Sequence, residues 1–262
     1  PEVIIKEAKE LVNSGVKEIT LLGQNVNAYN GLNEKNKSID FTSLIKILCK
    51  LDDLKRLRFV TSHPRDMTEN LINLFGQEEK LMPYLHLPIQ SGSNQILKKM
   101  NRGHTVEYYL DIISKLKVIR PEIAISGDFI VGFPGETEED FQKTLEICEI
   151  IKYSQAYSFK YSPRTGTPSF EMKDISEKVK SYRLSKLQET ISIYQREFQK
   201  NLVGTVQDVL IEKLGKLSDQ YIGRTPYMNP VVIKSKDNQI GKILPVKICE
   251  TNGLSLSGER VI

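Results

Sequence analysis

The sequence predicts an α/β protein in two parts, a partial, open βα barrel followed by a small all-β barrel. Three patterns predict this fold class. In the first two thirds of the chain, short β-branched and leucine-rich runs alternate with amphipathic helical stretches, as in parallel sheets with right-handed crossovers. A Pro/Gly-rich connector at 162–174 then leads into one long helical stretch. Beyond residue 202 the pattern changes to short strand-like runs that are separated by Gly, Asn and Asp.

The first βα units can be placed from their helix signals. The opening helix has the apolar face Ile4, Ala8, Leu11 and Val12 and ends at Gly15. Because a βα unit starts with its strand, we expect a strand before this helix that the chain lacks. Later helices are expected to begin at the capping side chains Asp40, Thr68, Thr105 and Thr137. The expected strands are 18–22, 57–61, 84–87, 124–131 and 155–161, and 30–38 is predicted as a polar loop. This count of units gives an open barrel, since about eight are needed to close one.

The second part of the chain follows the connector. Ser176 is the expected cap of a helix with the apolar seam Leu184, Leu187, Ile191, Tyr194 and Phe198. The seam is too short to favour a coiled coil, so we expect this helix to pack on the barrel. The expected strands of the all-β part are 203–212, 220–224, 230–235 and 243–250. The predicted domain limits are therefore 1–168 for the partial barrel, 169–201 for the connector and packing helix, and 202–262 for the β-barrel.

The composition restricts the classes of protein. Hydrophobic residues make up 39% of the 262 residues and charged residues 27%, which supports a packed core. No apolar run approaches the roughly 20 residues that cross a bilayer. The start, Pro1-Glu2-Val3, has no signal-peptide pattern and no Met, so we expect a cytoplasmic fragment or processed product with no membrane partner. The net charge of +4 permits a polyanionic partner without demanding one.

The cysteines predict no metal site. Cys49, Cys148 and Cys249 lie far apart in the sequence, and no two of them share a metal-ligand spacing. Cys49 and Cys148 stand on the apolar faces of helical patterns, which is typical of small core residues. The pattern fits a reducing cytosol.

The candidate ligand site lies where the predicted strands end. Ligands of parallel α/β folds bind at the carboxyl ends of the strands. Each of the five strands is followed by a loop that places Gly or Pro beside polar side chains. One such loop means little, but five on one rim predict a shared ligand cleft. The loops are Gly23-Gln24-Asn25, 62–65, 88–93, 132–136 and 162–166.

Three polar residues on this rim suit a nucleoside that carries an amino-acid tail. Gln90 and Asp128 offer acceptors for ribose hydroxyls, and Arg102 can bind a carboxylate at two points. Gly132 and Gly135 would let the backbone approach a flat ring closely. Two plainer interpretations stay open, a locally paired strand acid for Asp128 and a surface salt bridge for Arg102.

Several motifs resemble known families. Ser126 to Thr137, with the paired blocks 87–93 and 100–105, resembles the radical S-adenosylmethionine enzymes. Within that superfamily, 21–29 and 164–168 resemble the tRNA methylthiotransferases that act on N6-isopentenyladenosine. The tail, with 223–225 and 255–259, is similar to the RNA-binding TRAM domain. The resemblance covers nearly the whole chain.

The resemblance implies a fold, a reaction and a set of binding residues. The fold is a partial βα barrel of the radical S-adenosylmethionine type followed by a TRAM-like barrel. The reaction adds a methylthio group to carbon 2 of an adenosine next to the anticodon, with S-adenosylmethionine and 4Fe-4S clusters as cofactors and the tRNA anticodon stem-loop as partner. Cofactor binding is implied for Gln24, Gln90, Arg102, Asp128, Gly132 and Pro134. RNA binding is implied for Arg164, Arg224, Lys242 and Lys247.

The chain departs from the family at the cluster ligands. The family binds its radical cluster with a CxxxCxxC loop, and a second cluster lies in a further N-terminal domain. We expect this chain to start beyond both, so it supplies no cluster ligand and no catalytic residue of its own. The predicted consequence is a fragment that is inactive alone and that needs a missing N-terminal half. A non-catalytic tRNA-binding remnant is the alternative, as is a methylthiotransferase for threonylcarbamoyl adenosine or a ribosomal protein.

Two further groups of residues have open interpretations. His63, His86 and His104 could form a three-histidine metal site at the barrel mouth, although we favour three unrelated residues. Tyr157, Phe159 and Tyr161 alternate on one strand face. We expect them to pack in the core, with adenine stacking as the second interpretation.

Overall fold

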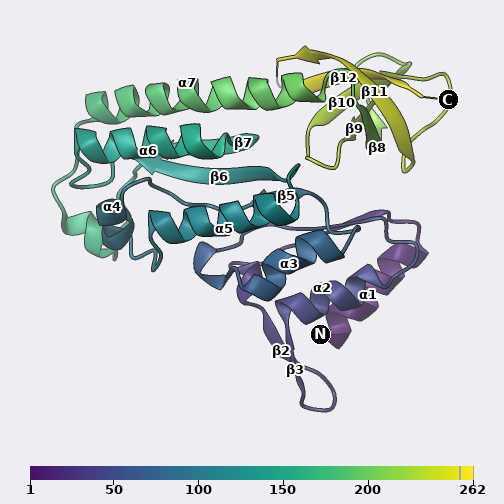
Figure 1. Ribbon diagram of the computed structural model, residues 1–262, viewed down its shortest axis with the longest axis horizontal. Helices are drawn as coiled ribbons and strands as arrows, with labels where there is room; N and C mark the ends of the chain where they lie inside the picture. The colour runs from purple at the N-terminus through teal and green to yellow at the C-terminus, as the bar shows by residue number, and fades with distance from the viewer. Residues whose placement is uncertain (254, 262) are drawn as a thin grey trace.

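The computed structural model describes residues 1–253 and 255–261. A curved α/β layer makes up the first part of the chain, and a long helix leads from it to a small β-barrel (Figure 1). The strands of the α/β layer are β1 (Glu18–Leu21), β4 (Arg56–Phe59), β5 (Tyr84–His86), β6 (Ala124–Val131) and β7 (Gln155–Lys160). Its helices are α1 (Glu2–Asn13), α2 (Phe41–Cys49), α3 (Glu69–Gln77), α4 (Asn94–Lys99), α5 (Val106–Ile119) and α6 (Glu138–Ile151). This architecture confirms the expected open, partial βα barrel.

The five parallel strands form two pieces rather than one continuous sheet. β1 pairs with β4, and β5, β6 and β7 form a three-stranded sheet. The two pieces are joined by a single bridge between Leu57 and Leu81. Pairing stops there because the Tyr84 N–H bonds back to the carbonyl of Met82, at 2.8 Å, instead of crossing to β4.

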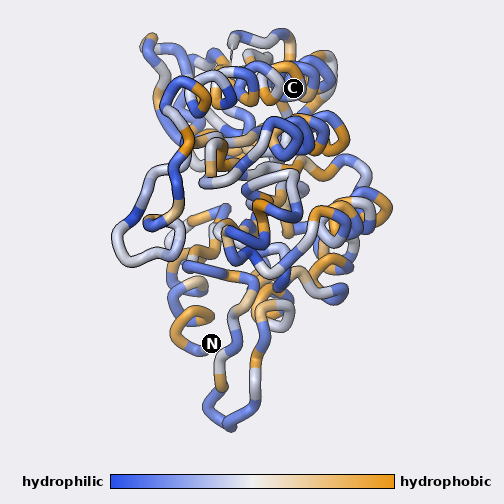
Figure 2. The backbone as a smooth tube through the Cα atoms, turned by 90° about the vertical axis from the view of Figure 1, so that its left-hand side faces the viewer, coloured by the Kyte–Doolittle hydropathy of each residue, from blue (hydrophilic) through white to orange (hydrophobic). Residues whose placement is uncertain are grey.

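The four predicted capping residues begin their helices as expected. Asp40, Thr68, Thr105 and Thr137 each accept a hydrogen bond from a backbone N–H of the first turn. The prediction of a loop at 30–38 is wrong at both ends, where β2 (Asn30–Leu32) and β3 (Ser38–Asp40) pair as a hairpin, and holds for 33–37, which connects them. The hairpin projects from the body, and its tip is hydrophilic (Figure 2). The helix α4 was not expected either, although Ser93 caps it.

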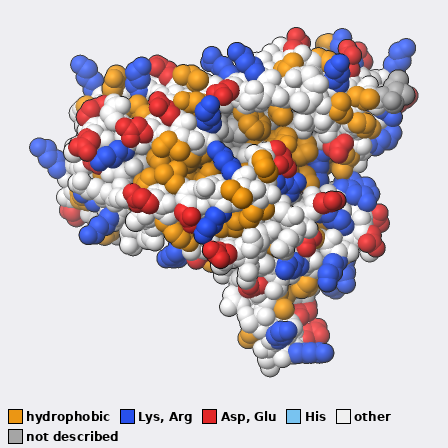
Figure 3. All heavy atoms as spheres, in the orientation of Figure 1, with side chains coloured by type: hydrophobic (Ala, Val, Ile, Leu, Met, Phe, Trp, Pro, Cys, Tyr) orange, Lys and Arg blue, Asp and Glu red, His pale blue; other side chains and the backbone are white. Residues whose placement is uncertain are grey.

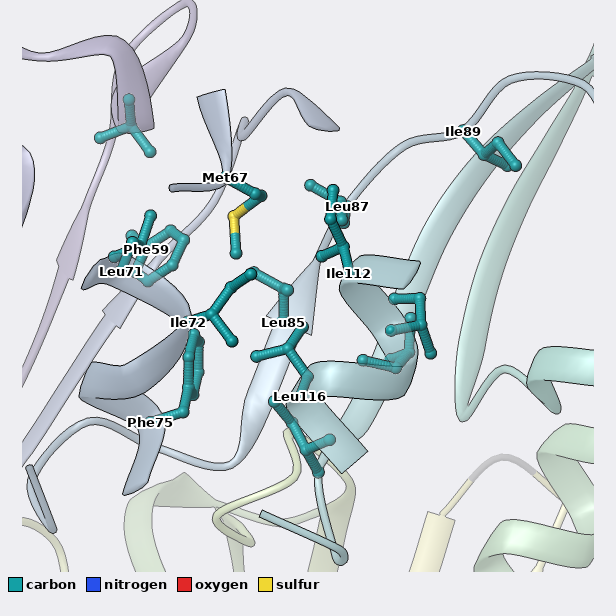
Figure 4. Close-up of a cluster of buried hydrophobic side chains, with 14 of the residues drawn as sticks. Phe59, Met67, Leu71, Ile72, Phe75, Leu85, Leu87, Ile89, Ile112 and Leu116 are labelled. Carbon is teal, nitrogen blue, oxygen red and sulfur yellow. The ribbon is translucent and has the colours of Figure 1, made fainter. Parts of the chain in front are cut away.

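The main core lies between the strands and the outer helices. Side chains from α3, β5 and α5 point toward one another there (Figure 4). Leu57, Phe59 and Leu85 show almost no exposed surface, and Cys49 and Cys148 are buried as expected. One side of each strand is therefore covered, which leaves the other side to form the inner face of the open barrel.

The helix α7 (Glu177–Leu202) connects the two cores. It lies along α6 and β7 (Figure 1). Leu187 and Ile191 are buried in the main core, whereas Phe198 and Leu202 pack into the core of the C-terminal barrel. The expectation that this helix packs on the barrel is confirmed.

The C-terminal barrel is closed, in the strand order β10-β12-β11-β8-β9. Its strands are β8 (Val206–Leu214), β9 (Gln220–Arg224), β10 (Pro230–Lys234), β11 (Ile243–Asn252) and β12 (Ser255–Arg260). Inward residues such as Val209, Val231 and Val246 fill it. The small all-β barrel is confirmed, although β12 was not among the expected strands. No helix in the described part of the chain has the length and apolarity to cross a membrane.

The two parts meet at a buried group of three charged side chains, Glu18, Arg56 and Arg58. Glu18 forms ion pairs with Arg56 at 3.5 Å and Arg58 at 3.0 Å. Arg56 donates hydrogen bonds to the carbonyls of Arg224 and Asp208, and Arg58 to those of Thr225 and Pro226. We call this group the docking triad, because it attaches β1 and β4 to the main chain of the C-terminal barrel.

Candidate functional site

A cavity of about 800 Å³ opens at the carboxyl ends of β5, β6 and β7. Four residues that the sequence singled out lie together in its lining, Gln90, Arg102, Asp128 and Arg164. They come from the loop after β5, the segment after α4, the strand β6 and the connector before α7. Of the five rim loops that we expect to share one cleft, 88–93, 132–136 and 162–166 contribute to this lining, whereas 23–25 and 62–65 do not.

Gln90 is held in an unusual backbone conformation at the cavity. Its φ of 79° lies in the left-handed region, which a residue with a side chain rarely adopts. The Gln90 N–H donates to the carbonyl of Asp128 and its carbonyl accepts from Ile130, both at 2.9 Å. These bonds bring the loop after β5 onto β6 and offset the strain, and both Gln90 and Asp128 line the cavity.

Asp128 has a histidine partner and still lines the cavity. The Nε2 atom of His86 lies 3.4 Å from Oδ2 of Asp128, and the carboxylate side chain is 26% exposed. The Nδ1 atom of His86 is 3.0 Å from Oγ of Ser126, which fixes the ring. The local pairing that we kept open for Asp128 is therefore present, and it leaves the carboxylate accessible from the cavity.

Arg102 is a half-buried guanidinium with free donors. Its Nη2 donates to the carbonyl of Pro88 at 3.2 Å, while its Nε is buried without a partner among the described residues. Burial lowers the pKa of Arg102, and the nearby charge of Asp128 opposes this shift. The salt-bridge alternative is wrong within the described part of the chain, where Arg102 has no ion pair. A half-buried guanidinium with unused donors suits a carboxylate ligand.

Gly132, Gly135 and Pro134 lie outside the cavity lining. A Cβ on Gly132 would meet Cγ of Lys180 at 2.4 Å, and one on Gly135 would meet Nζ of Lys99 at 2.5 Å. Lysine side chains therefore occupy the space that we expected a flat ring to use, and that steric explanation is wrong. Gln24 is exposed in the loop after β1 and is also absent from the lining.

The loop after β6 is attached to α7 instead. The N–H of Gly132 donates to Oε2 of Glu136 at 2.7 Å, and Arg183 pairs with the same oxygen at 2.8 Å. The side chain of Glu136 is completely buried, and burial raises its pKa. Lys180 adds an ion pair to Asp174 at 2.7 Å. Sequence reasoning missed Lys180 and Arg183, because both looked like ordinary charged positions of a surface helix.

The aromatic residues of β7 are a second correction. Tyr157 is 48% exposed and Phe159 is 55% exposed, so the expected core packing is wrong for both. Phe159 lines the cavity, as does Tyr161, whose ring packs against Phe133 with 4.9 Å between centroids. Figure 3 shows hydrophobic side chains gathered across the middle of one face of the molecule.

The histidines do not form a metal site. His63 and His104 stack edge to face with 5.4 Å between ring centroids, whereas His86 pairs with Asp128. Burial and the neighbouring charge of Arg102 lower the pKa of His63 to about 4. Among the described residues, no three His, Cys, Asp or Glu side chains are placed to hold a metal ion. We expected three unrelated histidines. This is wrong for His63 and His104, because their rings contact one another.

The cysteines do not fit an iron–sulfur cluster. Burial raises the pKa of Cys49 and of Cys148 to about 12, which keeps both thiols protonated in the core. Cys249 lies exposed on β11, in the other domain. A cluster needs thiolates gathered at one point, so the cysteines of this chain cannot hold one.

The predicted RNA-binding residues fall on two separate parts of the molecule. Arg164 lines the cavity, whereas Arg224, Lys242 and Lys247 belong to the C-terminal barrel. Arg224 pairs with Glu212 at 3.4 Å, so part of its charge is already compensated. Lys242 and Lys247 are exposed.

The fold and the cavity together define a class, the partial βα-barrel proteins that bind a ligand at the carboxyl ends of their strands. Residues 1–148 match the model of the Radical SAM superfamily. This is more than half of the 262 residues, and the chain belongs to that superfamily. Residues 200–261 match the TRAM domain.

The chain is similar to longer curated proteins. It is 52% identical over 260 residues to a Rickettsia felis protein named tRNA-2-methylthio-N(6)-dimethylallyladenosine synthase. It is 51% identical to the protein of the same name from Ehrlichia ruminantium. In both cases 98% of this chain is covered, and the chain spans 58% of the relative's length. Coproporphyrinogen III oxidase from Escherichia coli, a radical SAM enzyme, shares the fold at 16% identity, with a TM-score of 0.51 over 86% of this chain and 60% of that one.

Proposed function

We propose that this chain is the cofactor-binding and RNA-binding portion of a tRNA methylthiotransferase. The complete enzyme would add a methylthio group to carbon 2 of N6-isopentenyladenosine next to the anticodon, in the cytoplasm. The observation that carries the proposal is the convergence of Gln90, Arg102 and Asp128 on one cavity. The names of the relatives, which contain N(6)-dimethylallyladenosine, support an adenosine with this N6 substituent as the substrate.

The cavity residues fit S-adenosylmethionine. Arg102 would bind the carboxylate of its amino-acid tail, because its buried Nε lacks a partner among the described residues. Asp128 would accept a hydrogen bond from a ribose hydroxyl, and Gln90 would bind the same sugar from the facing loop. When bound, S-adenosylmethionine supplies the methyl group and the radical chemistry. Gln24, Gly132 and Pro134 would act on the cofactor only through the shape of their loops.

The clusters must be held by other cysteines. Since Cys49 and Cys148 are buried and protonated, we propose that the cluster ligands come from a separate polypeptide or region. The exposed position of the β1 loop, with Gln24, leaves that side of the rim accessible to it.

The RNA would bind the C-terminal barrel and reach the cavity. Lys242 and Lys247 would contact phosphates of the anticodon stem-loop, with Arg224 as a weaker contact because of Glu212. Arg164 lies at the cavity, where it would meet the RNA backbone near the target base. Binding of this kind weakens steeply with salt.

The test combines this chain with a cysteine-bearing N-terminal portion of a relative. After iron and sulfide reconstitution, mass spectrometry of the tRNA nucleosides measures the 2-methylthio product. We expect product from the wild-type mixture, and a loss of about tenfold to a hundredfold for Asp128→Asn, because a hydrogen bond to a charged group is worth about 1.5–3 kcal/mol. Glu146→Gln, a carboxylate on the outer helix α6, is the matched control and should stay active. If Asp128→Asn is as active as the control, the assigned cofactor site is wrong.

A second candidate function is a tRNA-binding remnant without catalysis. The unsuitable cysteines favour it, because RNA binding by the C-terminal barrel needs no cluster. Titration of the chain alone with an anticodon stem-loop across a salt series tests it. Binding in the reconstituted mixture without any methylthio product supports the remnant, and formation of product excludes it.

A further inference from the structure

We infer that Tyr157 and Phe159 form a binding surface for the target base, with the apolar N6 substituent packed against their rings. The inference rests on the proposed function, and it identifies the residues that would select a substrate with an isopentenyl group. We call the pair the aromatic shelf.

The shelf lies directly beside the proposed cofactor residues. In the β6–β7 register, Tyr157 is opposite Asp128 and Phe159 is opposite Ile130. Residues opposite one another in a parallel pair point to the same side of the sheet. Both rings therefore share the inner face with Asp128, and Phe159 also lines the cavity.

Tyr157 is held in place, and both rings of the shelf are left uncovered. The hydroxyl of Tyr157 accepts a hydrogen bond from Nε2 of Gln155 at 2.6 Å, and Gln155 in turn contacts the hydroxyl of Tyr84 at 3.4 Å. The ring of Tyr157 also lies 6.4 Å from that of His86. About half of each shelf ring stays exposed, although the neighbouring strand residue Phe129 is fully buried. Two neighbouring, half-exposed rings beside a cavity, one of them fixed by a hydrogen bond, are typical of a binding surface rather than of a core.

The chemistry of the shelf favours a purine with an apolar substituent. A nucleobase stacks on aromatic side chains, and the five carbons of an isopentenyl group gain by leaving water for such a surface. A cofactor held by Gln90, Arg102 and Asp128 would occupy one part of the cavity and leave the rings of Phe159 and Tyr157 for the second reactant.

The test measures how strongly the chain distinguishes two RNAs. The 262-residue chain is titrated with two anticodon stem-loops that differ in one respect, the isopentenyl group on the target adenosine. Fluorescence anisotropy at low salt gives the two dissociation constants and their ratio. For the wild type we expect tighter binding of the isopentenylated RNA by about tenfold or more, since a few methylene groups give discrimination of this size.

The variants Phe159→Ser and Tyr157→Ser should bring the ratio close to one, and the loss of base stacking should weaken the binding of both RNAs. Tyr182→Ser is the matched control, because Tyr182 is 56% exposed on α7, and it should keep the wild-type ratio. A ratio of one in the wild type, or an unchanged ratio in both shelf variants, overturns the inference and leaves the RNA-binding proposal standing. Absence of binding to either RNA would overturn the proposed RNA binding as well. Tight binding of a ribosomal protein peptide in place of RNA would also contradict the shelf's assignment.

Discussion

Replacing Glu18 with Gln would remove the negative charge between the two buried arginines of the docking triad. The side chains of Arg56 and Arg58 are 3% and 2% exposed, so they cannot regain water while the C-terminal barrel stays docked. Each ion pair has a Coulomb energy of about 5 kcal/mol at an effective dielectric constant of about 20. Both arginines keep their carbonyl acceptors, so we expect a net loss of about 3–5 kcal/mol, as for other broken buried pairs.

Thermal unfolding followed by circular dichroism measures this effect. For a chain of this size, 3 kcal/mol lowers Tm by roughly 6–12 °C. The control is Glu197→Gln, which breaks an exposed ion pair with Lys152 and should cost about 0–1 kcal/mol. Adding Arg58→Met to Glu18→Gln should recover part of the loss, because it removes one of the uncompensated charges. If Glu18→Gln lowers Tm no more than Glu197→Gln does, the triad does not hold the two parts together.

Three further outcomes follow from the geometry of the rim. Gly92→Ala should lower the free energy of unfolding in urea by about 1–3 kcal/mol, because the new Cβ would lie 2.2 Å from the carbonyl oxygen of Lys143. The control Gly23→Ala should change little, because its new Cβ would lie 3.6 Å from the nearest atom. The pKa of His63 is about 4 in the folded chain, so the unfolded state binds that proton first as the pH falls. The free energy of unfolding should therefore drop by ~1 kcal/mol between pH 7 and 5, after allowance for partial exposure. Urea unfolding at the two pH values should show that His63→Gln lacks this drop. Gln90→Gly should raise Tm or leave it unchanged, because it relieves the left-handed backbone strain. Equilibrium dialysis of the same variant should show weaker binding of S-adenosylmethionine. A gain in binding would contradict the assigned role of Gln90.

Local rules predicted most of the fold. Capping side chains such as Asp40 and Thr137 act within four residues, so the sequence alone located the helix starts. The hairpin at 30–40 was missed because its strands are three residues long and mostly polar, which gives no alternating apolar signal. The break between β4 and β5 was missed because it depends on one bond, from the Tyr84 N–H to Met82.

The candidate site was predictable where it follows topology. Gln90, Arg102 and Asp128 converge because the ends of parallel strands meet at one edge. The docking triad was not predictable, since Arg56 bonds to a carbonyl 168 residues away in the sequence. The alternation of Tyr157 and Phe159 was visible as well, but it does not tell which face of a strand stays uncovered.

The loop after β6 belongs to a motif that resembles a cofactor site, and it also contacts α7. Gly132 and Glu136 belong to the segment that resembles a cofactor motif, yet their contacts are with Lys180 and Arg183 of α7. The same helix ends in the core of the C-terminal barrel, through Leu202. Because α7 is one continuous helix between these contacts, a displacement of the barrel by bound RNA would be transmitted to the loop beside the cavity. Arg183→Met would leave the buried carboxylate of Glu136 without its ion-pair partner. We therefore expect this variant to lower the free energy of unfolding by about 3 kcal/mol and to loosen the loop. Faster hydrogen exchange at 132–136 would detect the loosening. Unchanged exchange in that loop would mean that α7 holds it by packing alone.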